Sequence, residues 1–374
     1  MNKVRQATIT PLASIFGSGF LVIIPILDSI AGPYSVLAMA LVCLIAFGVG
    51  SVIRYNIRYN EVPIEKGTAT KSTMLLEKLS DIALVPAYII SVTLYLRILS
   101  SYLLGFFNND IELYEQYITT GIILFILAIG LSKGLKALEG LEKWALAVTL
   151  FIIALVLACF AFYDIQTWQS GNLTLSKMPE RSWWEIATIL GGTLIVVQGF
   201  ETSRYLGHKY TATERIQSSR NSQIISTGVY LLFVLLATPL THFLTAKFSD
   251  NALIDLAKIA AFWLPIPLVL AAIFSQFSAA VADTFGASGN MQEFTHDKLS
   301  EKLSYLIICG FAILLCWLAN TGQILALASR AFAFYYLIQC LVALTNCKSF
   351  AKQALFSLLA VILLFITVFA VPAG

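Results

Sequence analysis

Eleven long apolar runs, separated by short polar or glycine- and proline-containing segments, constrain this chain more than any other feature. They lie near residues 11–31, 34–55, 83–107, 115–132, 141–163, 184–203, 222–246, 259–288, 303–319, 322–345 and 353–373. A helix needs about 20 mostly apolar residues to cross the hydrocarbon core of a bilayer, and it satisfies its own backbone hydrogen bonds there. The sequence therefore predicts an all-α integral membrane protein with about eleven transmembrane helices.

The composition excludes several other classes of protein. Hydrophobic residues make up 58% of the 374 positions and charged residues only 12%, which is far from the balance of a soluble domain. The apolar runs leave no room for a second domain, so residues 1–374 are expected to form one transmembrane domain. Lys and Arg are spread over many loops, so no nucleic-acid partner is expected. The cysteines and histidines show no metal-ligand spacing, so no metal enzyme is expected.

The distribution of Lys and Arg predicts the orientation in the membrane. If the N-terminus is cytoplasmic, one set of alternate loops carries a clear excess of basic residues: Lys3, Arg5, Arg54, Arg58, Lys66, Lys71, Lys133, Lys136, Arg204, Lys209, Arg215, Arg220, Lys298, Lys302, Lys348 and Lys352. The opposite loops are mixed or acidic, as at Asp110, Glu112 and Glu115. Because basic loops stay on the cytoplasmic side, we expect a multi-pass protein of the cytoplasmic (inner) membrane, with its N-terminus inside and its C-terminus outside.

Glycine interrupts two of the apolar runs at matching places. The interruptions are Phe16-Gly17-Ser18-Gly19-Phe20 and Gln198-Gly199-Phe200-Glu201, about 180 residues apart. A similar offset relates the third run to the eighth and the fifth to the tenth. The sequence therefore predicts two five-helix repeats, residues 8–163 and 184–345, followed by an additional helix at 353–373. Because five is odd, the second repeat is inverted, and inverted repeats with broken first helices are typical of alternating-access transporters.

A helix break at membrane depth predicts a polar binding site. Unwinding leaves N–H and C=O groups unpaired, at a cost of roughly several kcal/mol each unless they meet protein, water or ligand. The amides near Ser18, Gly19 and Phe20 would face an anionic group, and the free carbonyls around Val196, Val197 and Gln198 would face an ammonium or a metal cation. The candidate substrate site comprises Gly17, Ser18, Gly19, Phe20, Val197, Gln198, Gly199, Phe200 and Glu201. An amino acid zwitterion matches both ends; the alternative is that the glycines serve close helix packing.

At these residues the chain resembles the amino acid–polyamine–organocation (APC) superfamily, whose members share the LeuT-like fold. Residues 15–20 are similar to the Gly-Ser-Gly signature of that family's first helix, and residues 198–201 to the Gly-Phe-acidic turn of its sixth. Residues 134–144 and 275–297 resemble the entry to helix 5 and helix 8, so the resemblance covers about residues 8–345. The chain departs from many members in lacking a lysine at 147–151 and an Asn-Pro after its sixth span.

Ionisable and hydroxyl side chains within the runs are candidates for coupling transport to an ion. Charged groups are costly at membrane depth, so Glu201 and Asp283 are functional candidates, with Arg97 and Arg330 as possible charge partners of Asp283. Glu201 is a candidate for three roles: contact with a substrate amine, proton coupling, and support of the unwound backbone. Asp283 is read either as a coupling residue or as half of a structural ion pair with one of the two arginines.

A sodium site is a further expectation from the resemblance. In sodium-coupled proteins of this fold, helix 8 hydroxyls join backbone carbonyls of helix 1 around the ion. Ser275 and Ser278 lie on one face of the eighth run, so they are the candidate Na⁺ ligands here. The alternative is that both hydroxyls bond to their own helix backbone.

The leading hypothesis is a secondary transporter, symporter or antiporter, for an amino acid or related small organic amine. It needs no cofactor other than Na⁺ or H⁺ as a coupling ion, because no ATP-binding signature is present. An inorganic-ion transporter on the same fold is the alternative. A membrane-embedded enzyme ranks third, because no hydrolase or zinc motif occurs. The sequence leaves open the identity of the solute, the direction of transport and the oligomeric state.

Overall fold

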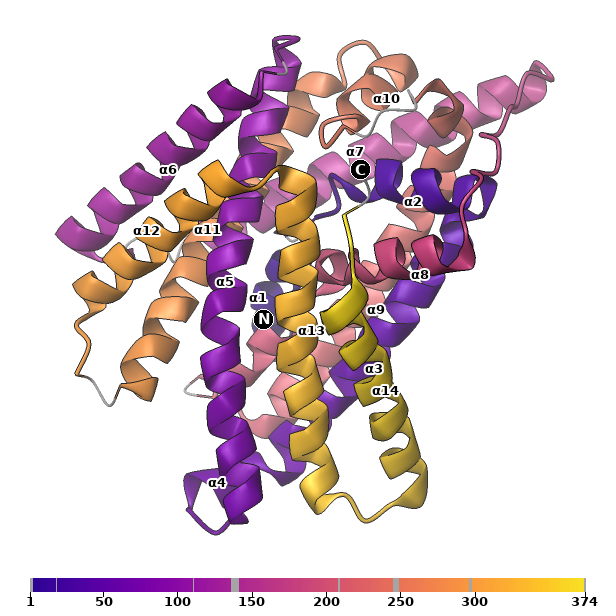
Figure 1. Cartoon of the computed structure of the whole chain (residues 1–374). Coiled ribbons are helices and arrows are strands. Elements are labelled where there is room, and N and C mark those ends of the chain that lie inside the picture. The colour runs from indigo at the N-terminus through magenta and orange to yellow at the C-terminus, as the bar shows by residue number, and fades with distance from the viewer. Residues whose placement is uncertain are drawn as a thin grey trace.

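Helices make up every regular element in the part of the chain that the structure describes (Figure 1). The structure is a computed structural model. It describes residues 3–17, 19–109, 111–135, 141–207, 209–244, 249–295 and 298–372. Within these ranges, nine helical segments are long and apolar enough to cross a membrane: Ile23–Tyr59, Lys71–Phe106, Glu112–Lys133, Leu141–Gln169, Ala212–Phe243, Pro265–Gln292, Glu301–Leu318, Thr321–Asn346 and Phe350–Phe369. The prediction of an all-helical membrane protein is therefore confirmed.

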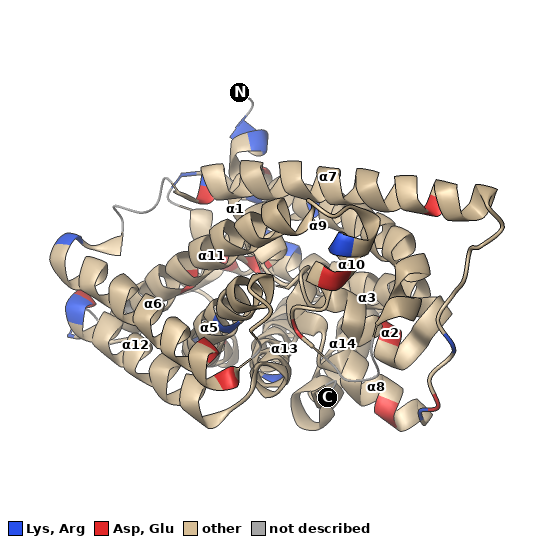
Figure 2. Cartoon of the chain, turned by 90° about the horizontal axis from the view of Figure 1, so that it is seen from above, with Lys and Arg blue, Asp and Glu red and all other residues tan. Residues whose placement is uncertain are grey.

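Most predicted runs correspond to one long helix each. These helices are α3 (Ser35–Tyr59), α5 (Lys71–Phe106), α6 (Glu112–Lys133), α7 (Leu141–Gln169), α9 (Ala212–Ala237), α11 (Pro265–Phe294), α12 (Glu301–Leu318), α13 (Thr321–Asn346) and α14 (Phe350–Phe369). Shorter connecting helices are η1 (Gly32–Tyr34), α4 (Glu61–Glu65), η5 (Thr238–Phe243) and α10 (Leu253–Ala260). Charged residues are sparse along the long helices, and most of the ribbon in Figure 2 is uncharged.

Two runs are divided into shorter helices. In the first, α1 (Lys3–Gly17) ends before α2 (Ile23–Ala31) begins; in the sixth, α8 (Trp183–Gly191) is followed by η3 (Leu194–Val197) and η4 (Phe200–Leu206). Gly19 has φ +147° and Gly199 has φ +122°, a region that residues with a side chain rarely adopt. These two glycines therefore allow the chain to leave the helical path where it does.

The helices pack in two groups. In one, α9 packs against α1 and α3; in the other, α5 packs against α11 and α6, and α12 packs against α6 and α11. Helix α7 joins the groups by contacting α1, α9 and α11, and α13 packs against α5, α3 and α14. One large buried apolar cluster contains residues from both interrupted runs and from most of the long helices. Both interrupted runs therefore lie in the interior of the bundle.

The predicted helix starts were wrong in three places, one of them the seventh run, where α9 begins at Ala212 and the apolar run suggested residue 222. Helix α5 begins at Lys71, whereas the apolar run suggested residue 83, because its first turns carry polar residues such as Glu77. Thr70 caps this helix by accepting a hydrogen bond from the Thr73 backbone N–H at 3.2 Å. The run 259–288 spans two elements, since α10 ends at Ala260 and α11 begins at Pro265. Hydropathy locates apolar segments, but capping and proline decide where the helices begin.

Candidate substrate site

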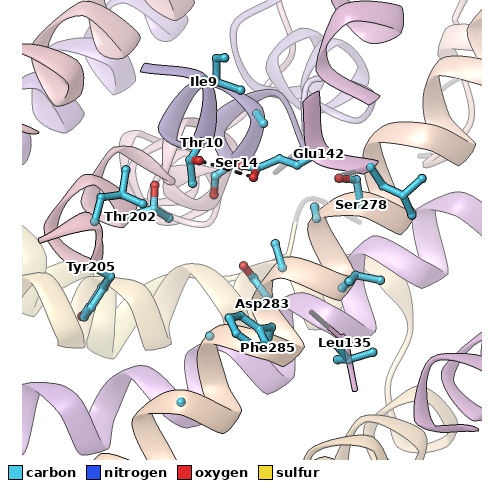
Figure 3. A pocket seen from close by; sticks show the side chains of 18 of the residues that line it. Ile9, Thr10, Ser14, Leu135, Glu142, Thr202, Tyr205, Ser278, Asp283 and Phe285 are labelled. Carbon is cyan, nitrogen blue, oxygen red and sulfur yellow. Dashed lines mark hydrogen bonds between the residues drawn. The ribbon is translucent and has the colours of Figure 1, made fainter. Parts of the chain in front are cut away.

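A cavity of about 890 Å³ enters the bundle beside α1. Five elements form its wall: α1, α5, α7, η4 and α11. Polar and charged side chains on the wall include Thr10, Ser14, Tyr88, Glu142, Lys143, Thr202, Tyr205, Lys209, Ser278, Asp283 and Asn290. Figure 3 shows ten labelled lining residues, among them Ser14, Thr202 and Asp283. A volume of this size accommodates a small organic molecule.

The eight candidate site residues that the structure describes mostly lie together, but they do not line this cavity. Phe20, Val197, Gln198, Phe200 and Glu201 are almost completely buried. Ser18 lies outside the described residues. The wall of the large cavity instead includes Ser14, three residues before Gly17, and Thr202, which directly follows Glu201. The breaks therefore form the packed region next to the cavity.

Gly17 serves helix packing. A Cβ atom at Gly17 would lie 2.7 Å from the Cβ of Ala279 on α11, which is closer than two carbon atoms can approach. Gly17 therefore permits close helix packing, which is the alternative that the sequence left open for this glycine.

Gly199 and Gly19 bring the two interrupted runs together. A Cβ atom at Gly199 would lie 2.6 Å from the backbone nitrogen of Ile15 and 2.7 Å from Oγ of Ser14. A Cβ atom at Gly19 would lie 3.1 Å from Cγ2 of Val196. The backbones of the two runs thus approach as closely as glycine permits.

The expectation of a free carbonyl at Val196 was wrong, because a hydroxyl from α9 reaches it. The Tyr230 hydroxyl lies 2.8 Å from the Val196 carbonyl oxygen and 3.1 Å from that of Ile15. Its ring stacks on Phe16, with centroids 5.9 Å apart. Both carbonyls belong to the last turn of a helix, where backbone oxygens lack intrahelical partners. One buried hydroxyl therefore joins the carboxyl ends of α1 and η3.

Two tyrosines on α5 hold the same region from another side. The Tyr102 hydroxyl donates to the Leu21 carbonyl at 2.7 Å, and the Tyr95 hydroxyl accepts from Nε2 of Gln198 at 2.9 Å. Tyr88, one heptad earlier, lines the cavity. The three tyrosines are seven residues apart and so lie near one face of α5, and two of them bind the two breaks.

Glu201 is fully buried at the start of η4. Its Oε2 atom accepts hydrogen bonds from the Gly199 backbone N–H and from the Tyr336 hydroxyl, each at 2.8 Å. Its Oε1 atom has no hydrogen-bond partner among the described residues. The carboxylate thus supports the second break in the present conformation.

Asp283 lies on α11 and lines the cavity, with 5% of its surface exposed. Its Oδ2 atom has no hydrogen-bond partner in the described parts of the chain. The expected ion pair with Arg97 or Arg330 was wrong. Arg97 pairs with Glu112 at 3.1 Å, and Arg330 donates from Nε to the Ala370 carbonyl at 2.7 Å. Both arginines were unsuitable because their helix faces point to other neighbours.

Ser275 and Ser278 line a second cavity, of about 10 Å³, between α1, α7 and α11. The Ser275 hydroxyl donates to the Ala272 carbonyl at a long 3.4 Å. Thr149 of α7 also lines this cavity, and its hydroxyl oxygen is buried without a hydrogen-bond partner in the described residues. The volume is about that of one water probe, so only a water molecule or a small ion would fit.

Ion pairs secure the η4 wall of the large cavity. Arg204 of η4 pairs with Glu77 of α5. Arg215 of α9 pairs with Glu61 at 2.6 Å and donates to the Arg204 carbonyl at 2.7 Å. These contacts connect η4 to helices of both groups.

Comparisons with known proteins identify the family. The family model described as APC superfamily transporter matches residues 1–370. A protein of Aquifex aeolicus (strain VF5), described as uncharacterised, is 39% identical over 378 residues, which cover 98% of this chain and 91% of that protein.

Solved structures of similar fold include two of the Eremococcus coleocola manganese transporter, one a mutant and one in complex with an aromatic bis-isothiourea substituted compound. Each has a TM-score of 0.59 and 14% identity and covers 98% of this chain and 85% of the other. At that identity the likeness concerns the fold alone. Since the family model matches nearly the whole length, this multi-pass membrane protein belongs to the APC superfamily of transporters.

Proposed function

We propose that this protein is a secondary active transporter that moves an amino acid or related small organic amine across the cytoplasmic membrane by alternating access. One observation carries the proposal: the cavity of about 890 Å³ ends beside the two interrupted helices. Ser14 and Thr202, which line it, both contact the second break, since a Cβ at Gly199 would touch Ser14 and the Thr202 hydroxyl donates to the Gly199 carbonyl at 2.7 Å. Breaks at such a site are typical of these transporters.

An inverted five-plus-five repeat accounts for the packing. Counting α1–α2 and α8–η3–η4 as one interrupted span each, with nine long helices, gives the eleven spans predicted from sequence. Helices that would be equivalent in the two repeats pack against one another: α3 with α9, α5 with α11, and α6 with α12. Two repeats related by a pseudo-two-fold axis produce such pairs, and α14 is then the additional helix.

The cavity opens on the side proposed to be cytoplasmic. Gln6, Lys143, Lys209 and Asn290 lie on its wall, at the helix ends that the positive-inside bias assigns to the cytoplasm. At the opposite end, residues of the segment before α8 lie against α2. The Ser176 hydroxyl donates to Asp28 at 2.6 Å, and Arg181 donates to the Ser29 carbonyl at 2.7 Å. This is the arrangement of an inward-facing state.

The small cavity is the proposed site of the coupling ion. Hydroxyl oxygens of Thr149, Ser275 and Ser278 suit Na⁺, which prefers hard oxygen ligands. Glu142 also lines this cavity and provides a carboxylate that would balance the ion's charge or carry a proton in a proton-coupled mechanism. Exchange of one solute for another remains the alternative to either ion.

An inorganic cation is the second candidate substrate. The similarity in fold to a manganese transporter favours it. Among the described residues, however, no three His, Cys, Asp or Glu side chains come together as a metal site. Without such a cluster the protein would balance the charge of a divalent cation only in part, so the organic substrate is preferred.

Uptake into proteoliposomes tests the proposal. Purified protein would be reconstituted and supplied with radiolabelled amino acids, amines or Mn²⁺ under an inward Na⁺ gradient, an inward H⁺ gradient or preloaded unlabelled solute. We expect an amino acid or amine to accumulate above protein-free liposomes under one of these conditions. Accumulation of Mn²⁺ alone, with no competition by amino acids or amines, would establish the inorganic alternative.

A further inference from the structure

We propose that Asp283 holds the ammonium group of the substrate in the large cavity, outside the two helix breaks, and that the substrate is an amine without a carboxylate. The inference rests on the proposed function and places the anchoring contact on α11. It begins from Asp283 itself, a carboxyl that is 5% exposed, lines the cavity and leaves Oδ2 without a hydrogen-bond partner in the described residues. Burying a carboxylate without a counter-charge is costly. A cation in the cavity would supply the missing charge.

The surroundings of Asp283 suit an organic ammonium. Tyr88 of α5 and Tyr205 of η4 contribute aromatic rings to the same wall, and an aromatic face attracts a cation. Thr202 and Ser14 contribute hydroxyl oxygens that accept the remaining ammonium hydrogens, since an ammonium has three donors. Much of the other lining is apolar and fits a hydrocarbon body.

A metal ion fits less well at this point. Glu201 is a carboxyl near Asp283 that could act as a further metal ligand. Its Oε2 atom, however, already accepts hydrogen bonds from Gly199 and Tyr336. The described residues provide no cluster of three His, Cys, Asp or Glu ligands. Asp283, with its unpaired Oδ2 beside aromatic rings, therefore favours an ammonium.

The site offers little to a substrate carboxylate. Gly19, whose amide was expected to face one, lies against Val196 and is absent from the cavity wall. The basic residues on the described wall are Lys143 and Lys209, and both are exposed to solvent. A carboxylate near Asp283 would face a like charge, which is unfavourable.

Binding to pairs of compounds that differ only in a carboxylate tests the inference. The pairs are isoamylamine with leucine, tyramine with tyrosine, and histamine with histidine, titrated into purified full-length protein by calorimetry, with Mn²⁺ as a separate ligand. We expect at least one amine to bind at least tenfold more tightly than its amino acid. Asp283→Asn should weaken that binding by about tenfold or more, because a charge-assisted hydrogen bond is lost. Asp255→Asn, on the exposed surface of α10, is the matched control and should bind as the unsubstituted protein does.

Wild-type protein provides a second test that does not depend on folding of a variant. Choline and its uncharged isostere 3,3-dimethyl-1-butanol would compete against the bound amine. Competition by choline alone supports a charged anchor, whereas equal competition by both overturns it.

The remaining outcomes separate this inference from the proposed function. Amine binding that Asp283→Asn leaves unchanged would remove Asp283 as the anchor but retain an amine transporter. Amino acids that bind as tightly as their amines would overturn the substrate class alone. Binding of Mn²⁺ with no organic ligand would contradict both the inference and the proposed function.

Discussion

The Tyr336 hydroxyl donates a 2.8 Å hydrogen bond to Oε2 of Glu201, and that oxygen also accepts the Gly199 backbone N–H. One carboxylate oxygen therefore connects α13 to the break between η3 and η4. Phe200 stacks on the Tyr336 ring, with centroids 5.4 Å apart, and covers the contact. Of the three roles considered for Glu201, support of the unwound backbone is the one that these contacts favour.

Replacing Glu201 with Gln distinguishes these roles. The amide oxygen of Gln can accept both hydrogen bonds now made by Oε2, so Glu201→Gln should retain folding, most of the transport rate and an unchanged pH profile. Glu201→Leu leaves both donors unpaired at a cost of about 1–3 kcal/mol each, and its thermal unfolding midpoint should fall. Loss of concentrative uptake in Glu201→Gln, with normal folding, would show that the charge itself is required.

Gly17 and Ala279 form a compensating pair. Gly17→Ala places two Cβ atoms 2.7 Å apart, and overpacking of this kind typically costs about 1–3 kcal/mol. We expect Gly17→Ala to lower the thermal unfolding midpoint and Gly17→Ala/Ala279→Gly to recover most of it. If the double variant is no more stable than Gly17→Ala, the clash with α11 is not the reason for glycine at this position.

Tyr230→Phe removes one oxygen and retains the ring that stacks on Phe16. The carbonyls of Ile15 and Val196 would lose this donor, so the two half-helices would be joined less firmly. We expect the maximal transport rate to change more than the KM, because Tyr230 is absent from the cavity wall. Tyr230→Leu, which also removes the ring, should lower stability further. A KM increase with an unchanged maximal rate would instead place Tyr230 in substrate binding.

The helices and the places of their interruption follow from local sequence. Apolar run length predicts a membrane helix, and Gly19 and Gly199 stand where the backbone adopts positive φ. The length of an apolar run reflects the thickness of the bilayer, and a glycine at positive φ reflects the conformational freedom of that residue. Both are properties of a short segment of chain, so both can be read from local sequence. The start of α5 at Lys71 was missed because its first turns are polar, although a helix can extend beyond the hydrocarbon core.

The partners of the buried groups could not be predicted in the same way. Arg97 and Asp283 are opposite charges in neighbouring spans, yet Arg97 pairs with Glu112 and Glu115. Which face of α5 meets α6 and which meets α11 depends on helix rotation, and a single sequence does not reveal the rotation of a helix whose apolar and buried polar residues are spread around its circumference. The contact of Tyr230 with two distant carbonyls was missed for the same reason.

Sodium should stabilise the protein if the small cavity is the coupling site. Thr149 has an unpaired buried hydroxyl there, so Na⁺ at 100 times its Kd would stabilise the folded state by about 2.7 kcal/mol. Raising Na⁺ at constant ionic strength against K⁺ should increase the unfolding midpoint, and Thr149→Val should remove most of the increase. Equal midpoints in Na⁺ and K⁺ would favour the alternative that the serines bond only to their own helix.

The pH dependence of binding provides a separate test of Asp283, because a proton and an ammonium cannot both occupy its carboxylate. Choline carries the same charge at every pH, so any change in its affinity reports on the protein. We expect choline to bind more weakly as pH falls, since protonation of Asp283 removes the negative charge. Among the described residues, the other titratable and charged groups in the cavity wall or near Asp283 are Tyr88 and Tyr95 of α5, Glu142 and Lys143 of α7, Glu201 and Tyr205 of η4, and Lys209 and Tyr210 after η4.

Two variants assign the pH effect. Glu142→Gln should retain the decrease if Asp283 is responsible, and Asp283→Asn should bind weakly at every pH with little further change. Each tenfold loss of affinity corresponds to about 1.4 kcal/mol, so a series of calorimetric titrations between pH 5 and pH 8 would resolve the effect. A pH dependence that persists in Asp283→Asn and disappears in Glu142→Gln would move the proton to α7. In that case Asp283 would not be the group whose protonation weakens binding of the ammonium.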